Sequence, residues 1–202
     1  EILADEGAFA ATRIGVETVE PVEQAALQPG DKIGEMTVAQ GPYPFDFNVP
    51  PIPAFCNTNP FFEPGNAVAT PGEYTVECTM PPLPELLVGF GWVAINADRR
   101  DIEWAALDSE LYINDQAVDQ AAFGSVDADI PVTGVPGLDA SEVVTQALRA
   151  WNVVLKNVST GPLTLRWVFH VDQELNDGVV TVPAGTYDTT FKVTVDESLT
   201  AS

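Results

Sequence analysis

Apolar and polar residues alternate most clearly in the last third of the chain. Leu163 to Asp172 changes character at nearly every position, and Tyr187 to Val195 does the same with threonine at several of its polar positions. A period of two residues is typical of a half-buried strand. We therefore predict two strands, and the solvent-exposed face of the second should be rich in threonine. Asn176 to Gly178 lies between them and predicts a tight turn, so the two strands should pair antiparallel.

Shorter strands are predicted upstream from the same kind of evidence. Leu86 to Ile95 is apolar on both faces and rich in glycine, which favours one central strand between two layers. Leu111 to Ile113, followed by Asn114 and Asp115, indicates a strand and a turn. Trp151 to Leu155 indicates another strand, closed by a turn at Asn157 to Pro162. Connections this short predict antiparallel pairing of consecutive strands.

Proline and capping patterns mark the other segments. Val49 to Pro53 and Pro81 to Pro84 should be edge or connecting segments, because proline removes a donor from the ladder of a sheet. Asp139 and Glu142 have the form of a capping box, and the apolar residues that follow share a helical face. One short helix is therefore expected near 140–149. The remaining pattern of many short strands predicts an all-β fold, an antiparallel β-sandwich of immunoglobulin-like or jelly-roll type.

Two stretches near the end, WNVVLKNVSTGPLTLRWVF (151–169) and PAGTYDTTFKVTV (183–195), carry a family resemblance. They resemble the terminal strands of immunoglobulin-like modules in bacterial secreted and surface proteins. The resemblance covers about the last 55 residues and implies a sandwich architecture without any functional residue. The chain departs from antibody-type domains, since neither Trp92 nor Trp104 lies between Cys56 and Cys78.

Length and charge narrow the class of protein. The chain has 202 residues, which we divide into an acidic, partly ordered lead-in at 1–30 and a single β-sandwich domain at 31–202. Its 8 basic residues against 30 acidic ones give a net charge of −22. Such a charge excludes nucleic acid and anionic lipid surfaces as partners. No apolar run approaches the roughly 20 residues of a membrane-spanning helix.

The cysteines and the first residue indicate the cellular compartment in which the protein is expected. The chain starts at Glu1 without a basic and apolar leader, so we expect a secreted protein whose signal peptide has been removed, located outside the cell, on its surface or in a periplasm. Cys56 and Cys78 match no metal-binding or redox spacing. A disulfide between them is expected in an oxidising compartment, and two free thiols are the alternative.

Catalytic chemistry finds little support in the sequence. The single histidine, His170, lies on the polar face of a predicted strand, and no serine sits in a nucleophile elbow. One histidine and two cysteines are too few for the usual zinc sites. We therefore expect no catalytic residues and no enzyme. A glycan-acting enzyme with two carboxylates stays an alternative, since the acidic residues offer many candidate pairs.

Acidic residues and tryptophans give two candidate binding sites. Residues 98–142 hold eleven acidic and two basic residues. Calcium prefers six to eight oxygen ligands from carboxylates and carbonyls, so Asp127 and Asp129, with Asp98 and Asp101, are possible ligands. A solvated acidic rim is the alternative. Trp104 is the candidate for stacking on a sugar ring.

These observations favour a non-catalytic secreted or cell-surface β-sandwich with a binding, assembly or structural role. A filament or surface-layer subunit is one version, in which the chain pairs with a protein partner or with copies of itself. A carbohydrate-binding accessory module is a second reading. The glycan-acting enzyme is the third.

Overall fold

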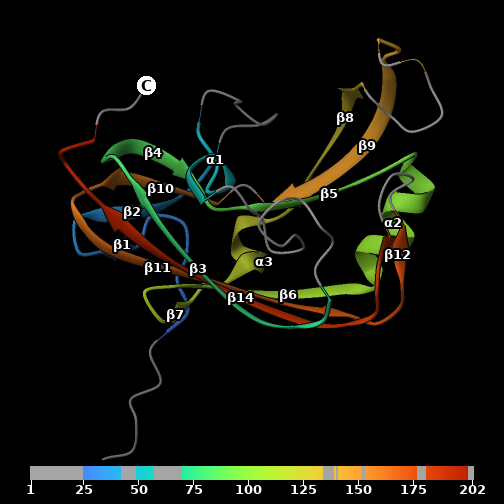
Figure 1. The fold of residues 1–202 in the computed structure, drawn as a ribbon. Coiled ribbons are helices and arrows are strands. Elements are labelled where there is room, and N and C mark those ends of the chain that lie inside the picture. Colours follow the sequence, from blue (N-terminus) through green and yellow to red (C-terminus); the bar gives the residue numbers. More distant parts are fainter. Residues whose placement is uncertain are drawn as a thin grey trace, which may run out of the picture.

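Strands dominate the computed structural model, which describes residues 25–41, 49–56, 70–133, 139, 141–151, 153–176 and 181–199 (Figure 1). The elements, in chain order, are β1 (Lys32–Ile33), β2 (Met36–Gln40), α1 (Pro53–Cys56), β3 (Gly72–Met80), β4 (Leu83–Leu87), β5 (Phe90–Ala94), α2 (Ala97–Ala105), β6 (Leu107–Ile113), β7 (Gln116–Ala117), α3 (Gln120–Phe123), β8 (Val126–Val132), β9 (Val144–Trp151), β10 (Val153–Val158), β11 (Gly161–Val171), β12 (Leu175–Asn176), β13 (Thr181–Val182) and β14 (Gly185–Val195). The predicted all-β class is confirmed.

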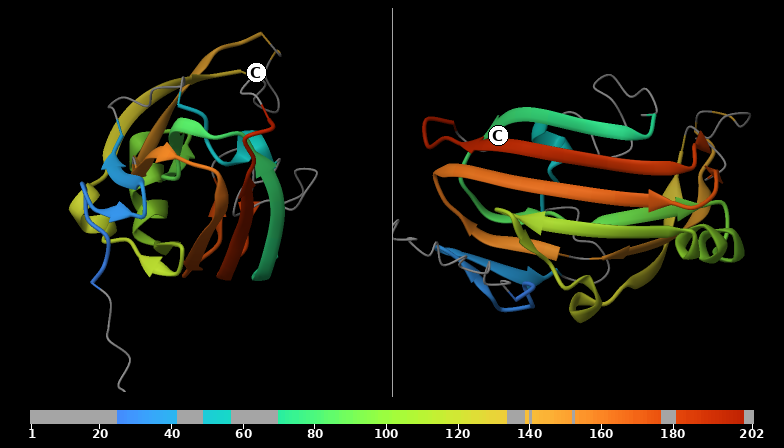
Figure 2. Two further views of the ribbon diagram at one scale, coloured as in Figure 1. Left: turned by 90° about the vertical axis from the view of Figure 1, so that its left-hand side faces the viewer. Right: turned by 90° about the horizontal axis from the view of Figure 1, so that it is seen from below.

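The described strands form four sheets. The largest has the order β3-β14-β11-β6-β7, and the next has the order β1-β2-β10-β4. A three-stranded sheet, β5-β9-β8, and a two-stranded one, β12-β13, complete the set. Figure 2 shows the long strands β3, β14, β11 and β6 side by side. Pairing within the sheets is antiparallel except between β14 and β3, which run parallel over the full length of β3.

One core joins the two largest sheets. The inward positions of β11 and β14 supply Leu165, Phe169, Tyr187 and Phe191, each 0% exposed, and the four-stranded sheet supplies Val38, Leu86 and Leu155, also 0% exposed. The two strands predicted from strict alternation are confirmed, because every second residue of each faces this core. Fully burying one such side chain contributes about 1.5–3 kcal/mol.

The helix expected near 140–149 is wrong. Residues Val144–Trp151 form β9, the middle strand of its sheet, with β5 and β8 on either side. Gln146, Ala147 and Leu148 are buried in succession, which removes the period of two that a half-buried strand shows. The capping pattern is instead a turn, in which the backbone N–H of Glu142 donates to the carbonyl of Asp139 at 2.8 Å.

The apolar run Leu86 to Ile95 is two strands rather than one central strand. β4 ends at Leu87 in the four-stranded sheet, and β5 begins at Phe90 in the three-stranded one. The crossing point is crowded, since a Cβ on Gly89 would lie 1.9 Å from the carbonyl oxygen of Trp151. Only glycine permits this close approach of two backbones.

Gly89→Ala should therefore destabilise the fold. The added methyl group meets backbone, which cannot rotate away, and we expect a loss of about 1–3 kcal/mol in the free energy of unfolding. Urea denaturation measures the loss. Gly72→Ala is the control, because its φ is not positive and the added methyl group would meet other atoms only at 3.7 Å and beyond. An unchanged midpoint for Gly89→Ala would contradict the close approach.

Short connections do not always join paired strands. β10 and β11 are separated by two residues, yet β10 pairs with β2 and β4 whereas β11 pairs with β14 and β6. The antiparallel pairing expected for these neighbours is thus wrong, because the turn carries the chain from one sheet to the other. Asn157 (φ 57°) and Gly161 (φ 136°) make the change of direction possible.

Two other local predictions are confirmed. Asn114 and Asp115, with φ of 48° and 65°, form the two-residue turn between β6 and β7. Pro84 lies in β4, an edge strand in the sheet order, as proline requires. The turn expected at Asn176 to Gly178 falls largely outside the described residues, as do residues 1–24 of the lead-in.

A segment that we call the strap, Val49–Cys56, ties two edge strands together. The N–H of Leu87 in β4 donates to the carbonyl of Pro50 at 3.0 Å, and the N–H of Ile52 donates to the carbonyl of Leu87 at 3.3 Å. At its end, Cys56 forms a disulfide with Cys78 of β3, which confirms that prediction. Ile52 is 2% exposed, so the strap also belongs to the core.

Within the described residues, no helix is long and apolar enough to cross a membrane.

Candidate functional site

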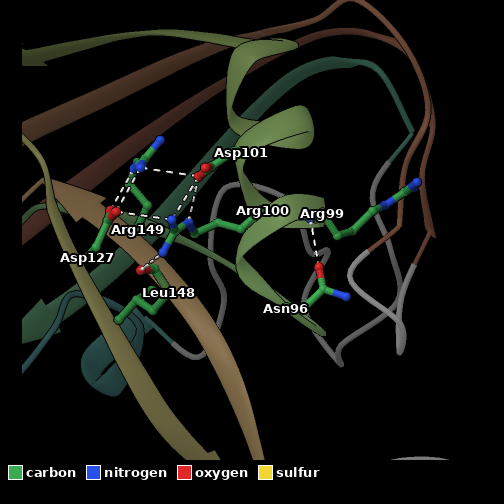
Figure 3. Close-up of polar contacts among 7 residues, drawn as sticks. All are labelled: Asn96, Arg99, Arg100, Asp101, Asp127, Leu148 and Arg149. Atoms are coloured by element: carbon green, nitrogen blue, oxygen red, sulfur yellow. Dashed lines mark hydrogen bonds and ion pairs between the residues drawn. The ribbon is translucent and has the colours of Figure 1, made fainter.

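Two arginines and two aspartates form a compact cluster where α2 meets β8 and β9 (Figure 3). Arg149 donates to both carboxylate oxygens of Asp127, at 2.6 and 2.8 Å. Arg100 Nη2 lies 2.8 Å from Asp101 and 3.0 Å from Asp127, and Arg149 lies 3.2 Å from Asp101. The Arg100 side chain is nearly buried and also donates to the carbonyl of Leu148 at 3.3 Å. The cluster therefore fastens α2 to the three-stranded sheet.

This cluster contains two of the four acids predicted to bind calcium. Asp101 and Asp127 come together, but the positive charge beside them is supplied by the chain's own guanidinium groups. Asp98 and Asp129 are exposed and take no part in these ion pairs. Among the described residues, no group of three or more candidate metal ligands is assembled. Calcium binding stays a prediction, and at Asp127 it would compete with two arginines.

The ion pairs also change the pKa values of Asp127 and Arg149. The hydrogen bond from Arg149 is the largest cause that lowers the pKa of Asp127 below its ordinary 3.8, and the charges of Arg149 and Arg100 add to the effect. The same hydrogen bond raises the pKa of Arg149. A carboxyl group whose pKa is lower in the folded state stabilises that state above the unfolded pKa, and this contribution is lost as the pH falls.

Asp127→Asn should accordingly show a pH-dependent cost. We expect the difference in free energy of unfolding between wild type and variant to be constant above about pH 5. The difference should shrink as the pH falls below 3.8 and through the lowered pKa. Urea denaturation between pH 3 and 7 measures it. Asp129→Asn, an exposed residue two positions along the same strand, is the matched control and should change the free energy of unfolding at pH 7 by less than about 0.5 kcal/mol. A pH-independent difference would contradict the role of the ion pairs.

Sequence reasoning missed Glu103 in α2, which is 1% exposed and is the most deeply buried carboxylate of the described part of the chain. One of its oxygens accepts from Trp92 Nε1 in β5 at 2.7 Å, and the other accepts from Arg99 Nε and from the backbone N–H of Asn176, each at 2.7 Å. The i, i+4 spacing of Arg99 and Glu103 on a helix was the available signal. The two partners from β5 and β12 could not be read from the sequence.

Trp104, the predicted sugar-stacking residue, lies at the edge of an aromatic cluster. Its ring is 4.9 Å from that of Trp151 and 6.3 Å from that of Phe90, and the side chain is half-buried. Phe90 in turn contacts Phe169 in the core at 4.6 Å. Packing accounts for the position of Trp104, and its role in sugar binding stays a prediction.

A broad polar surface covers the outer side of the five-stranded sheet. We call it the threonine face and define it by the outward residues Glu73, Thr75, Glu77, Thr79, Thr164, Arg166, Asp188, Thr190, Lys192 and Thr194. The register of β14 with β3 places Thr190 beside Thr75 and Thr194 beside Thr79. It also places Lys192 beside Glu77, an opposite-charge cross-strand pair.

Ion pairing organises the face around Arg166. Its guanidinium donates to both oxygens of Asp188, at 2.8 and 2.6 Å, and lies 5.3 Å from the centre of the Tyr112 ring. The hydrogen bond to Asp188 raises the pKa of Arg166. Tyr112 donates to Glu110, and this bond is the largest cause that raises the pKa of Tyr112. Arg166 is thus held in one place by partners on β14 and β6.

His170 lies further along the same outer surface. Its Nδ1 is 3.1 Å from the hydroxyl of Thr186, and its Nε2 is 3.6 Å from Glu110. The order of hydroxyl, imidazole and carboxylate imitates a nucleophile and its base. The side chains of His170 and Glu110 are, however, 42% and 46% exposed on an open sheet surface. We interpret the row as a polar contact across three strands.

Two shallow, open grooves lie over the threonine face. The larger, of about 490 Å³, is lined on its outward side by Glu77, Thr79, Pro162, Thr164, Lys192 and Thr194. The smaller, of about 280 Å³, is lined by Glu73, Tyr74, Thr75, Arg166, Asp188 and Thr190. They follow one another along β14, because residues 188, 190, 192 and 194 are successive outward positions of that strand.

Comparison with known proteins gives no family. No family model matches the chain, and no curated protein matches it. A structure of PbICP-C in complex with falcipain-2 shares 12% identity over 65% of this chain and 95% of that one, with a TM-score of 0.29. The cysteine protease inhibitor EhICP2 from Entamoeba histolytica shares 11% identity over 61% and 87%, with a TM-score of 0.23. At such TM-scores the two similarities carry no argument about this chain.

Proposed function

We propose that this protein is a non-catalytic binding protein of an oxidising, extracytoplasmic compartment, and that the threonine face is its binding surface. The face carries the proposal because three long strands, paired with one another in fixed register, present hydroxyl and charged groups. A rigid and open surface of this kind suits contact with an extended partner rather than the enclosure of a small substrate.

Two further features support the compartment and the lack of catalysis. The disulfide between Cys56 and Cys78 is the kind of cross-link that persists in oxidising surroundings. The histidine contact on the outer sheet is open to solvent, whereas catalytic groups act best where water is excluded.

Co-sedimentation with insoluble cell-envelope material tests the proposal. The wild-type protein should sediment with the material, and the supernatant should contain no newly released sugars or peptides. Thr75→Glu/Thr190→Glu places two charges at the centre of the threonine face and should abolish sedimentation. Thr145→Glu, on an exposed position of β9, is the matched control and should sediment like the wild type. Release of soluble products, or equal sedimentation of all variants, would contradict the proposal.

Self-assembly is a second candidate, and one observation favours it. β3 is an edge strand of nine residues, and no described strand pairs with its outer side. An edge strand of this length can accept a strand from another chain. Sedimentation velocity of the protein alone separates this function from the first, since concentration-dependent growth of the particle would indicate assembly.

A further inference from the structure

The two grooves of the threonine face define the chemistry of a ligand. We infer that they bind an extended, neutral glycan, an inference that rests on the binding role proposed above. Five threonine hydroxyls line them: Thr75, Thr79, Thr164, Thr190 and Thr194. Each hydroxyl can donate one hydrogen bond and accept others, which matches the mixed donors and acceptors of a polyol.

The charge of the grooves differs from that of the whole chain. The lining residues include two of the 8 basic residues, Arg166 and Lys192, but only three of the 30 acidic ones, Glu73, Glu77 and Asp188. Their sum, 2 − 3, is −1, while the chain as a whole carries −22. This nearly neutral strip on a strongly acidic protein favours a neutral ligand.

Other occupants fit the charges less well. An anionic polymer would approach a chain whose net charge of −22 repels it. A second copy would bring two such chains face to face, with the same repulsion. A neutral polymer meets neither penalty, and it can use the paired charges of Arg166 and Asp188 as one donor and one acceptor group.

The shape and rigidity of the strip fit an elongated ligand. Asp188 to Thr194 spans six residue steps of β14, which corresponds to about 20 Å along an extended strand. β14 is paired along its whole length with β11 on one side and over nine residues with β3 on the other. Positions held in this way need little ordering when a ligand binds.

Affinity gel electrophoresis through neutral and acidic polysaccharides tests the inference. Neutral β-glucan, xylan and mannan are the positive probes, and alginate and heparin are the acidic ones. At least one neutral polysaccharide should retard the wild-type protein. Thr79→Val/Thr194→Val keeps the size and strand preference of both residues while removing two hydroxyls, and it should bind about tenfold more weakly or worse. Thr145→Val is the matched control and should bind like the wild type.

Different outcomes contradict the neutral-glycan inference and the proposed non-catalytic binding function. Retardation by acidic polysaccharides alone, or by none, overturns the neutral-glycan inference even if the protein still sediments with envelope material. Equal affinity of the double variant and the wild type also overturns it, because the groove would then not be the site. Unchanged urea midpoints for both variants ensure that a weakened variant is folded. Release of reducing sugars from the gel matrix would instead overturn the non-catalytic function itself.

Discussion

Replacing Glu103 with leucine is expected to lower the free energy of unfolding by about 2–4 kcal/mol, because the buried indole N–H of Trp92 and the part-buried backbone N–H of Asn176 lose this acceptor. Glu103 accepts hydrogen bonds from Trp92, Arg99 and Asn176, which lie on β5, α2 and β12. Arg99 is partly exposed and can turn to water, so the cost falls mainly on the other two donors. Urea denaturation, monitored by tryptophan fluorescence, measures the loss and also reports on the surroundings of Trp92.

Two controls define what the result means. Glu103→Gln keeps the shape of the side chain and one accepting oxygen, so its loss should be smaller than that of the leucine variant. Asp98→Asn removes an exposed charge from the same helix and should change stability by less than about 0.5 kcal/mol. If the leucine variant were as stable as Asp98→Asn, the carboxylate would not be holding the three elements together.

Removing the disulfide is the second change with a large expected effect. Cys56 and Cys78 are 22 positions apart, and closing a loop of that length restricts the unfolded chain by about 3 kcal/mol in the chain-entropy account. The variant Cys56→Ala/Cys78→Ala should therefore lose about that much stability, measured by urea denaturation under oxidising conditions. The wild type in excess reductant should lose a similar amount, which makes reduction an independent check.

The strap adds a local readout to the disulfide prediction. Its hydrogen bonds to Leu87 should open more often once Cys56 is no longer tethered to β3. Hydrogen exchange should therefore quicken at the amides of Ile52 and Leu87, while amides in the centre of β11 keep their protection relative to the global stability. Equal exchange in both forms, or a stability change below about 0.5 kcal/mol, would show that the strap stays in place without its tether.

Sequence patterns succeeded where burial was one-sided. β11 and β14 each have one solvent-exposed face, so the alternation of apolar and polar residues identified them. The turn at Asn114 and Asp115 could be predicted because these residue types tolerate positive φ. β9 was misread because Gln146, Ala147 and Leu148 are all buried. For such a segment, periodicity cannot separate a strand from a helix.

The candidate sites could not be fully predicted from the sequence, because they are formed by residues that are distant along the chain. Asp101 and Asp127 were predicted from the sequence as possible calcium ligands together with Asp98 and Asp129. The structure places only these two in one ion-pair network, which the sequence could not predict because their partner Arg149 is distant along the chain. The threonine-rich face of β14 was visible in the sequence. Its extension onto β3 depends on a parallel register between residues more than a hundred positions apart, which no local pattern encodes.

The position of β14 has a consequence for how this chain is made. β14 follows every other strand of the described chain, yet it lies between β3 and β11 in the sheet order. A ribosome or a translocation channel releases residues in order, so β3 has no partner among the described strands until the residues of β14 have emerged. The larger sheet can therefore close only after β14 has been synthesised, and a chain cut before Gly185 would lose the middle of that sheet rather than an edge.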